Sequence, residues 1–398
     1  MSSSAPSSSR FSWLSQIALC LAVFAALWFF GQTIFPRIDD YVAYTVNSVG
    51  IVIILAVSLN LINGITGQFS LGHAGFMGIG AYVCAYFTKE IGAQIIDPVN
   101  LLIGLVCGAL SAGIAGLLVG IPSLRLRGDY LAIVTLGFNL IIISIIQNLK
   151  IVGDASGYVG IPKLTTFAWV FGMVFLCILS IRNLAMSGLG RAMRAVRDDE
   201  IAAEAAGINT TQIKILAFVF SAMWAGVAGG LQANLIQYAN PGDFEFLKSV
   251  EIVVAVVLGG LGSITGSALA AAGLKISEEI LRSVQGVLWM SLGLIALAAF
   301  WSFQARRAAG KFAGLEIVKW LAAPLFSLAI VLGLYFFAGG LLEERKGSLR
   351  YILYALILIV VMLLRPQGIL GRSEWSMNGL KRIFGRNQIT KTKVRALD

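Results

Sequence analysis

The chain has 398 residues, of which 58% are hydrophobic and only 13% are charged. Soluble domains carry roughly 25% charged residues, so about half of the usual charge is missing. Several apolar runs reach the ~20 residues that a helix needs to cross a bilayer. These features exclude an ordinary soluble protein. They predict an all-α, polytopic integral membrane protein with about 10–12 transmembrane helices and two Gly-rich broken or re-entrant segments.

The net charge of +10 does not indicate a nucleic-acid partner, because half of it lies at one end of the chain. Residues 372–398 hold seven basic and two acidic residues. This pattern is typical of a basic cytoplasmic tail beside anionic membrane lipid. The cysteines lie far apart in apolar runs, so neither a disulfide framework nor a metal site is predicted. They are Cys20, Cys84, Cys107 and Cys177.

In chain order, a Ser-rich and disordered N-terminus is predicted over residues 1–14, followed by a transmembrane domain over 15–371. The apolar runs predict spans at 15–35, 41–62, 74–87, 99–121, 130–149, 167–184, 214–238, 249–261, 264–281, 286–303, 317–341 and 349–364. Twelve crossings place both termini on one side of the membrane. That side then holds 20 of the 30 Lys and Arg residues, so the positive-inside rule makes it cytoplasmic.

A glycine-dense stretch over residues 64–82 contains six glycines and the only histidine, His73. At membrane depth, backbone leaves a helix only where protein or water satisfies its polar groups. The stretch therefore predicts a discontinuous helix that lines a transport path. Close helix packing through small residues is an equally good explanation of the same spacing.

A second glycine-dense stretch, residues 258–266, also follows an apolar run. Both stretches contain an Ile-Thr-Gly step, at 65–67 and at 264–266. Paired breaks of this kind predict an internal repeat around a central path.

Several functional classes are excluded by what the sequence lacks. No G-x-x-x-x-G-K-[ST] motif occurs, so the chain is not expected to bind and hydrolyse ATP itself. The sequence contains no nucleophile–base set and no metal motif that would indicate an enzyme. The predicted spans hold almost no ionisable residues near their centres, whereas proton-driven carriers usually need them. The energy for transport is therefore expected to come from another subunit.

The longest charged segment, residues 185–213, predicts a short cytoplasmic helix. Asp198 is the expected N-cap, and Gly207 suits the left-handed position that ends a helix. The helix would present a narrow apolar stripe at Ile201, Ala205 and Ile208. Because two turns are marginally stable alone, the helix is expected to dock on a surface. A solvated helix that pairs its own charges is the alternative.

This segment resembles the E-A-A-x-x-x-G coupling motif of ABC-importer permeases, with the motif's core at 204–209. Other stretches are similar to one family, the branched-chain amino acid (LivM-type) permeases, and lie at 58–75, 124–138, 191–209, 257–266 and 364–371. The chain differs from the family in one region. About sixty additional residues, 286–346, look like an inserted helical hairpin.

The resemblance implies a permease subunit of an ABC-type importer in the bacterial inner membrane, with branched-chain or hydrophobic amino acids as substrate. Its implied partners are a second, LivH-type permease, two cytoplasmic ATPase subunits that use ATP, and a periplasmic or extracellular binding protein. No cofactor is expected in this chain. Two alternatives remain: the same mechanism with urea or short-chain amides, and an ion-coupled secondary transporter.

The resemblance also assigns expected roles to residues. ATPase coupling is expected to use Arg191, Arg194, Arg197, Asp198, Glu200, Glu204 and Gly207. The translocation path is expected to involve Asn60, Asn63, Gly67, Gln68, Ser70, His73, Gly259, Gly260 and Ser263. Broken-helix N-termini can face a carboxylate there, while apolar walls accept aliphatic side chains. For His73, a purely structural hydrogen-bonding role is favoured over contact with substrate.

Overall fold

The computed structural model of the protein describes residues 29, 31, 33, 38–123 and 129–281. The chain divides into two compact units, residues 1–272 with 365–398 and residues 273–364. Nearly all described residues therefore belong to the first unit. Several predictions lie outside the described residues: the Ser-rich start, the first span, the inserted hairpin, the last span and the basic tail.

The described elements are mostly helices. They are α2 (Asp40–Asn60), α3 (His73–Tyr86), α4 (Asp97–Ser123), α5 (Asp129–Gln147), α6 (Phe167–Met186), α7 (Gly188–Asp198), α8 (Glu200–Ala205), α9 (Thr210–Ile236), α10 (Phe246–Gly259) and α11 (Ile264–Leu281). π-Helical turns occur at Leu61–Ile65 and Phe87–Ile91, and 3-10 turns at Gly92–Gln94, Lys150–Val152, Asp154–Ser156 and Pro241–Phe244. Two short strands, β1 (Tyr158–Val159) and β2 (Tyr238–Ala239), pair antiparallel.

The polytopic all-α fold is confirmed. Within the described residues, five helices are long and apolar enough to cross a membrane: Asp40–Ile65, Asp97–Ser123, Tyr130–Gln147, Phe167–Met186 and Thr210–Ile236. The predicted spans at 74–87 and 249–261 are helices of only 14 residues each, α3 and α10. At 1.5 Å per residue α10 is about 21 Å long, which is short of the ~30 Å hydrocarbon core. Helix α3 is not cut short in this way, because it continues directly into the π-helical turn Phe87–Ile91.

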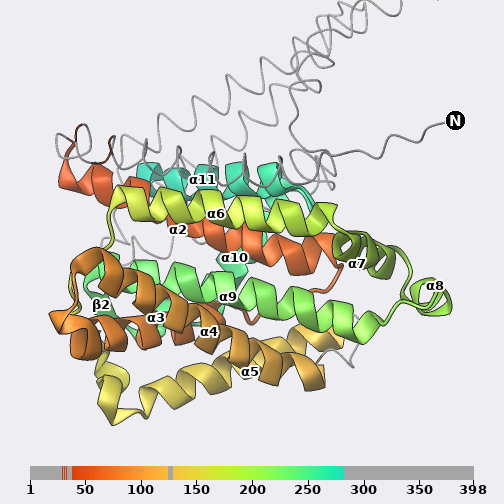
Figure 1. Ribbon diagram of the computed structural model, residues 1–398, viewed down its shortest axis with the longest axis horizontal. Coiled ribbons are helices and arrows are strands. Elements are labelled where there is room, and N and C mark those ends of the chain that lie inside the picture. Colours follow the sequence, from red (N-terminus) through yellow and green to blue (C-terminus); the bar gives the residue numbers. More distant parts are fainter. Residues whose placement is uncertain (1–28, 30, 32, 34–37, 124–128, 282–398) are drawn as a thin grey trace, which may run out of the picture. The chain divides into compact units, whose positions relative to one another are not determined.

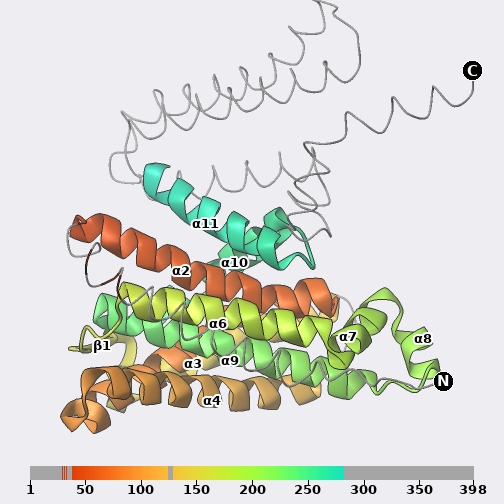
Figure 2. The same ribbon diagram turned by 45° about the horizontal axis from the view of Figure 1, so that its top comes forward.

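Helix α9 lies at the centre of the described bundle and packs against α3 and α4 (Figures 1 and 2). Glycines set these contacts. A Cβ on Gly80 of α3 would clash with the backbone of Gly226 in α9, and a Cβ on Gly229 would clash with the Met77 carbonyl. Next to them, the rings of Phe76 and Phe218 meet edge to face at 5.4 Å. Small residues thus allow close approach, and large ones fill the space between the contacts.

The two ends of the bundle differ in structure. Helices α7 and α8 lie at one end and the β1–β2 pair at the other (Figures 1 and 2). At the strand end, Tyr158 donates a hydrogen bond to Glu90 at 2.9 Å, and the Lys89 ammonium lies 4.4 Å from the Tyr158 ring centroid. Burial, aided by Glu90, raises the pKa of Tyr158 above its ordinary value, so the phenol stays protonated and remains a donor.

Candidate functional site

The first glycine break is a non-helical segment between helices α2 and α3. Helix α2 ends in the π-helical turn Leu61–Ile65, and helix α3 begins only at His73. Between them Gly67 has φ = +76°, a conformation that L side chains rarely adopt. Both explanations of the glycine spacing therefore hold, in different halves of the stretch. Residues 66–72 interrupt the helix, and the glycines of α3 pack closely against other helices.

Side chains satisfy the backbone donors of this break. The amide of Ser70 donates to Asn63 Oδ1 at 3.2 Å, within the break itself. The amide of Leu71 donates to Thr135 of α5 at 3.0 Å, and that of Ala74 donates to Ser249 of α10 at 3.1 Å. Non-helical backbone is stable at membrane depth only with such partners. The break is therefore held open by three helices, and α3 is not merely frayed.

His73 lies at the first position of α3 and is 1% exposed. Its Nε2 lies 2.9 Å from Ser58 Oγ of α2, so the ring connects the two helices on either side of the break. Its Nδ1 and both amide atoms of Gln68 are buried and have no hydrogen-bond partner among the residues that the structure describes. The expected structural contact of His73 is present, and these unpartnered atoms leave hydrogen-bonding capacity inside the bundle.

The structure brings the second break into direct contact with the first through Asn60. The Asn60 side chain is fully buried; its Nδ2 donates to the Ser263 carbonyl and its Oδ1 accepts from the Gly262 amide, both at 2.9 Å. Gly64 approaches so closely that a Cβ there would clash with the Gly262 backbone. Two segments about 200 residues apart in sequence thus form one polar unit.

Glycine conformation and a serine cap shape the second break. Helix α10 ends at Gly259, and Gly260 follows with φ = +109°. Ser263 is fully buried, and its Oγ accepts from the Gly266 amide at 3.1 Å, in the first turn of α11. The two Ile-Thr-Gly steps on which the repeat prediction rests differ in their backbone conformation. The first Ile-Thr-Gly step ends at the left-handed Gly67, whereas the second lies inside helix α11.

Sequence reasoning missed three residues around the first break: Thr135, Ser249 and Asn139. The side chains of the first two accept hydrogen bonds from backbone amides at this break, as described above. Asn139 is fully buried, and a Cβ on Gly75 would lie 2.6 Å from its Oδ1. Thr135 and Asn139 are polar residues in an apolar run, which is the signal that could have identified them. Ser249 lies between Lys248 and Glu251, so the sequence gives no such signal there.

At the other site, the short helix predicted in segment 185–213 exists as α8, but its N-cap differs from the prediction. Asp199, and not Asp198, accepts hydrogen bonds from the amides of Ile201 and Ala202, at 2.9 and 3.1 Å. Asp198 belongs to the last turn of α7, where it pairs with Arg197 at 3.0 Å. The backbone ladder of α7 continues through Asp198, since the Asp199 amide donates to the Ala195 carbonyl at 3.0 Å, so the extended residue that can act as a cap comes one position later.

The end of α8 follows the prediction. Gly207 has φ = +83°. Its amide donates to the Glu204 carbonyl at 2.9 Å, and the Ile208 amide donates to the Ala203 carbonyl at 3.0 Å. This pair of bonds is a Schellman motif, which requires a left-handed residue and therefore favours glycine.

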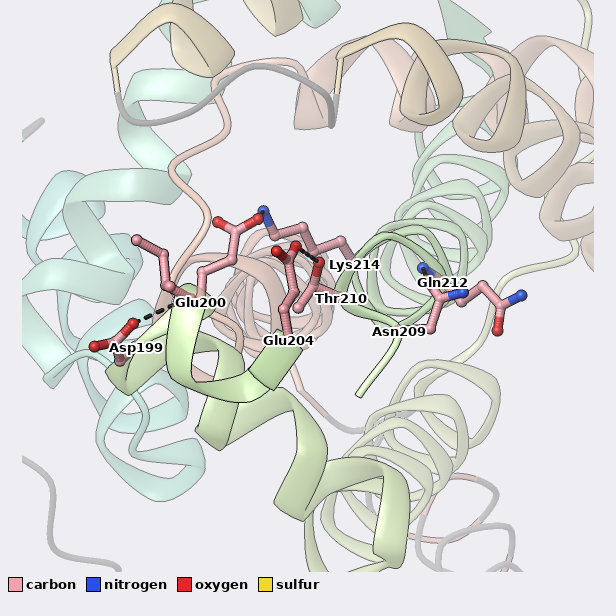
Figure 3. A network of polar contacts seen from close by, with 8 residues as sticks. Asp199, Glu200, Glu204, Asn209, Thr210, Gln212 and Lys214 are labelled. Carbon is pink, nitrogen blue, oxygen red and sulfur yellow. Dashed lines mark hydrogen bonds and ion pairs between the residues drawn. The ribbon is translucent and has the colours of Figure 1, made fainter. Parts of the chain in front are cut away.

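Two side-chain contacts attach α8 to the start of α9 (Figure 3). The Lys214 ammonium lies 2.6 Å from Glu200 Oε1, and the Lys214 side chain is only 7% exposed. Thr210 donates to Glu204 Oε1 at 2.7 Å. The opposite face of α8 is open: Ile201 is 69% exposed and Ala205 is exposed too. Helix α8 is thus attached to α9 by two polar contacts, while its apolar Ile201 side chain is exposed.

The three arginines of α7 occupy different environments. Arg191 is exposed, Arg194 is half-buried, and Arg197 turns inward, where its Nη1 donates to the Gly64 carbonyl at 3.2 Å. Helix α7 and the first break, predicted as parts of separate sites, are therefore in direct contact.

Metal-ligating side chains do not cluster in the part of the chain that the structure describes. In that part Cys84, Cys107 and Cys177 are free thiols. Buried free cysteines pack as small hydrophobic side chains.

Comparison with known proteins identifies the family. A family model for the branched-chain amino acid transport system permease component matches residues 41–300. The chain is 38% identical over 287 residues to the high-affinity branched-chain amino acid transport system permease protein LivM of Salmonella typhimurium, and 37% identical to LivM of Escherichia coli. Each match covers 63% of this chain and 66% of the relative.

A more distant relative is the permease protein LivH of Escherichia coli, 27% identical over 248 residues, which cover 57% of this chain and 80% of LivH. No solved structure matches the chain. The multiple apolar helices and the family match describe a multi-pass membrane protein. The chain belongs to the family of permease components of branched-chain amino acid transport systems.

Proposed function

We propose that the chain is the permease subunit of an ABC-type importer, with its motor on separate ATPase subunits. The observation that carries this proposal is α8. A two-turn helix is marginal in water by itself, yet here a cap, a Schellman motif, an ion pair and a hydrogen bond hold it in place. A short helix that is held by these contacts and exposes the apolar Ile201 side chain suits a docking element for a partner protein.

The bundle end with α7 and α8 is then the cytoplasmic end, where two ATPases dock, and both chain termini lie on the same side. The opposite end, with β1 and β2, receives a periplasmic or extracellular binding protein. A second permease of the LivH type completes the membrane part. The presence of both LivM and LivH among the relatives supports this pairing.

The translocation path is proposed to run along the two glycine breaks. The buried polar atoms there include the unpartnered amide of Gln68 and Nδ1 of His73. Such groups suit the amino and carboxylate ends of a small solute, and the surrounding apolar helices suit an aliphatic side chain. Branched-chain amino acids are the favoured substrates because the relatives carry that name. Urea or short-chain amides are the second candidate.

The test is co-purification of the detergent-solubilised protein with ATPase subunits, identified by mass spectrometry and by vanadate-sensitive ATP hydrolysis. The decisive variant is Ile201→Asp, which places a charge on the exposed face of α8 without touching its cap or its ion pair. The matched control is Val159→Asp, because Val159 is similarly exposed, at 61%, at the opposite end of the bundle. Gly207→Pro is a stronger variant that disrupts the backbone which ends α8.

We expect ATPases to co-purify with wild type and with Val159→Asp and to be lost with Ile201→Asp and Gly207→Pro. Equal retention by all four proteins would exclude α8 as the docking element. Absence of ATPase from wild-type preparations would contradict the importer itself. Uptake driven by an ion gradient in vesicles with this protein alone would then favour a secondary transporter.

A further inference from the structure

Arg197 differs from the other arginines of its helix because its charged group points into the molecule. Its Nη1 donates to the Gly64 carbonyl at 3.2 Å, while its Nε and Nη2 donate to Asp198 Oδ1 at 3.2 and 3.0 Å. The side chain is 20% exposed. A guanidinium is planar and presents several donors in fixed directions, so it can hold a carboxylate and a carbonyl together.

Glycines from both breaks make room for this side chain. A Cβ on Gly67 would lie 2.5 Å from Arg197 Cγ and 3.0 Å from its Cβ, so the arginine stem passes where a side chain would otherwise be. A Cβ on Gly262 would lie 3.4 Å from Arg197 Nη1. Arg197 therefore contacts the first break along its stem and reaches the second break with its end.

The contacts beyond Arg197 make the two breaks behave as one unit. Asn60 joins them through its bonds to Gly262 and Ser263. The carbonyl that Arg197 binds, Gly64, lies in the π-helical turn directly after Asn60. A shift of the guanidinium therefore acts on the first break directly and on the second break through Asn60.

The contacts before Arg197 lead to the coupling helix. Two residues after Arg197, Asp199 caps α8. Met193 and Val196 of α7 are buried, at 0% and 5% exposed, so the helix packs firmly against the bundle. Its last turn, which holds Arg197, then moves together with the rest of the helix. No flexible linker separates Arg197 from α8, because α7 ends at Asp198 and α8 begins at Glu200. A displacement of α8 is thus passed to Arg197 over one cap.

We propose that Arg197 is the positioning residue through which a displacement of α8 reaches both glycine breaks, by its hydrogen bond to the Gly64 carbonyl and its packing on Gly67. This inference rests on the proposed function, since α8 must first receive the motion of an ATPase. It assigns to Arg197 an inward role instead of a contact with the ATPase surface. Contiguous hydrogen bonds and a rigid helix supply the physical link that such coupling requires.

The test uses the full permease complex with its co-purifying ATPases, reconstituted in lipid. The main variant is Arg197→Met, which keeps the stem that packs on Gly67 and removes the donors. Arg197→Lys is the conservative variant, which retains one donor and the charge. Arg182→Met is the control, because Arg182 is exposed on the neighbouring helix α6.

The measurement is amide hydrogen exchange of residues 61–72 and 200–209, with and without vanadate trapping of the ATPases, together with substrate uptake and ATP hydrolysis. In wild type and Arg182→Met we expect both segments to respond to trapping. In Arg197→Met, residues 200–209 should still respond and residues 61–72 should not. Uptake should then fall about tenfold while ATP hydrolysis continues, and Arg197→Lys should restore part of the response.

The outcomes separate the inference from the proposed function. A full response of residues 61–72 in Arg197→Met overturns the role of Arg197 and leaves the importer intact. Loss of ATPase binding in that variant also overturns it, because Arg197 would then belong to the docking surface. If residues 200–209 of wild type do not respond to trapping, the docking of α8 fails, and this inference fails with it.

Discussion

The two glycine breaks and helix α8 share one local feature, a glycine at positive φ that turns the chain. A short polar side chain also caps α8 and the helix after the second break, whereas α3, after the first break, has no side-chain cap. The breaks direct their polar groups inward, so that Asn60 and Ser263 are fully buried. Helix α8 instead exposes Ile201. The comparison teaches that local geometry specifies a turn, while tertiary packing decides whether its side chains are buried or exposed.

Their stability is expected to differ in the same way. Each buried polar group in the breaks depends on a particular partner, so the loss of one contact leaves an unpaired group away from water. The contacts of α8 are partly solvated, so water replaces a lost partner at lower cost. Substitutions of comparable size should therefore lower the unfolding free energy more near the breaks than around α8.

The largest effect is expected where helix α3 of the first break packs against α9. Gly229→Ala should destabilise the protein by about 3 kcal/mol, because the added Cβ would clash with the Met77 carbonyl and lie 2.9 Å from the Ala81 amide nitrogen. The thermal unfolding midpoint in detergent measures this. Gly137→Ala is the matched control, since no heavy atom lies within 4 Å of its would-be Cβ. Similar midpoints for the two variants would contradict the packing.

A smaller loss is expected when the contact between the two breaks is removed. Asn60→Leu leaves the Gly262 amide and the Ser263 carbonyl without their partner, which should cost about 2 kcal/mol. Amide exchange at Gly262 should accelerate in parallel. Asn148→Leu is the control, because Asn148 is exposed just after the end of α5 and its side chain donates to the Ser144 carbonyl four residues earlier. Unchanged exchange at Gly262 would show that the breaks are held independently.

At the contact between α8 and α9, Lys214→Met should lower the unfolding free energy by about 1–2 kcal/mol, since it removes the cation that pairs with Glu200. The ion pair is only partly shielded, with Glu200 24% exposed, so water limits the loss. The double variant with Glu200→Gln tests the pairing itself. Its loss should be smaller than the sum of the two single losses, whereas strict additivity of the unfolding free energies would contradict a coupled pair.

The smallest effect is expected at the end of α8. Gly207→Ala should cost about 1 kcal/mol, because alanine is strained at a positive φ, while nothing within 4 Å opposes its Cβ. Gly188→Ala, at the start of α7 and without positive φ, should leave the unfolding midpoint unchanged. An equal shift for both would mean that the left-handed turn is not what Gly207 provides.

The sequence by itself determined the class of the protein and the five long spans that the described residues contain. Apolar length alone predicts a membrane helix, since it depends on the bilayer and not on neighbouring helices. The five described spans follow those predictions to within a few residues at most ends. Local chemistry likewise predicted that Gly207 ends a short helix, because the left-handed position selects glycine before any tertiary contact forms.

Tertiary structure decided what these local signals could not. Asp198 is not the cap because the backbone ladder of α7 continues through it, and the start of α3 is fixed by hydrogen bonds to Thr135 and Ser249 on other helices. The bond from Asn60 to Gly262 and the inward turn of Arg197 join segments more than 100 residues apart. Such pairings depend on which buried polar groups meet when the helices pack, and no local pattern in the sequence encodes that meeting.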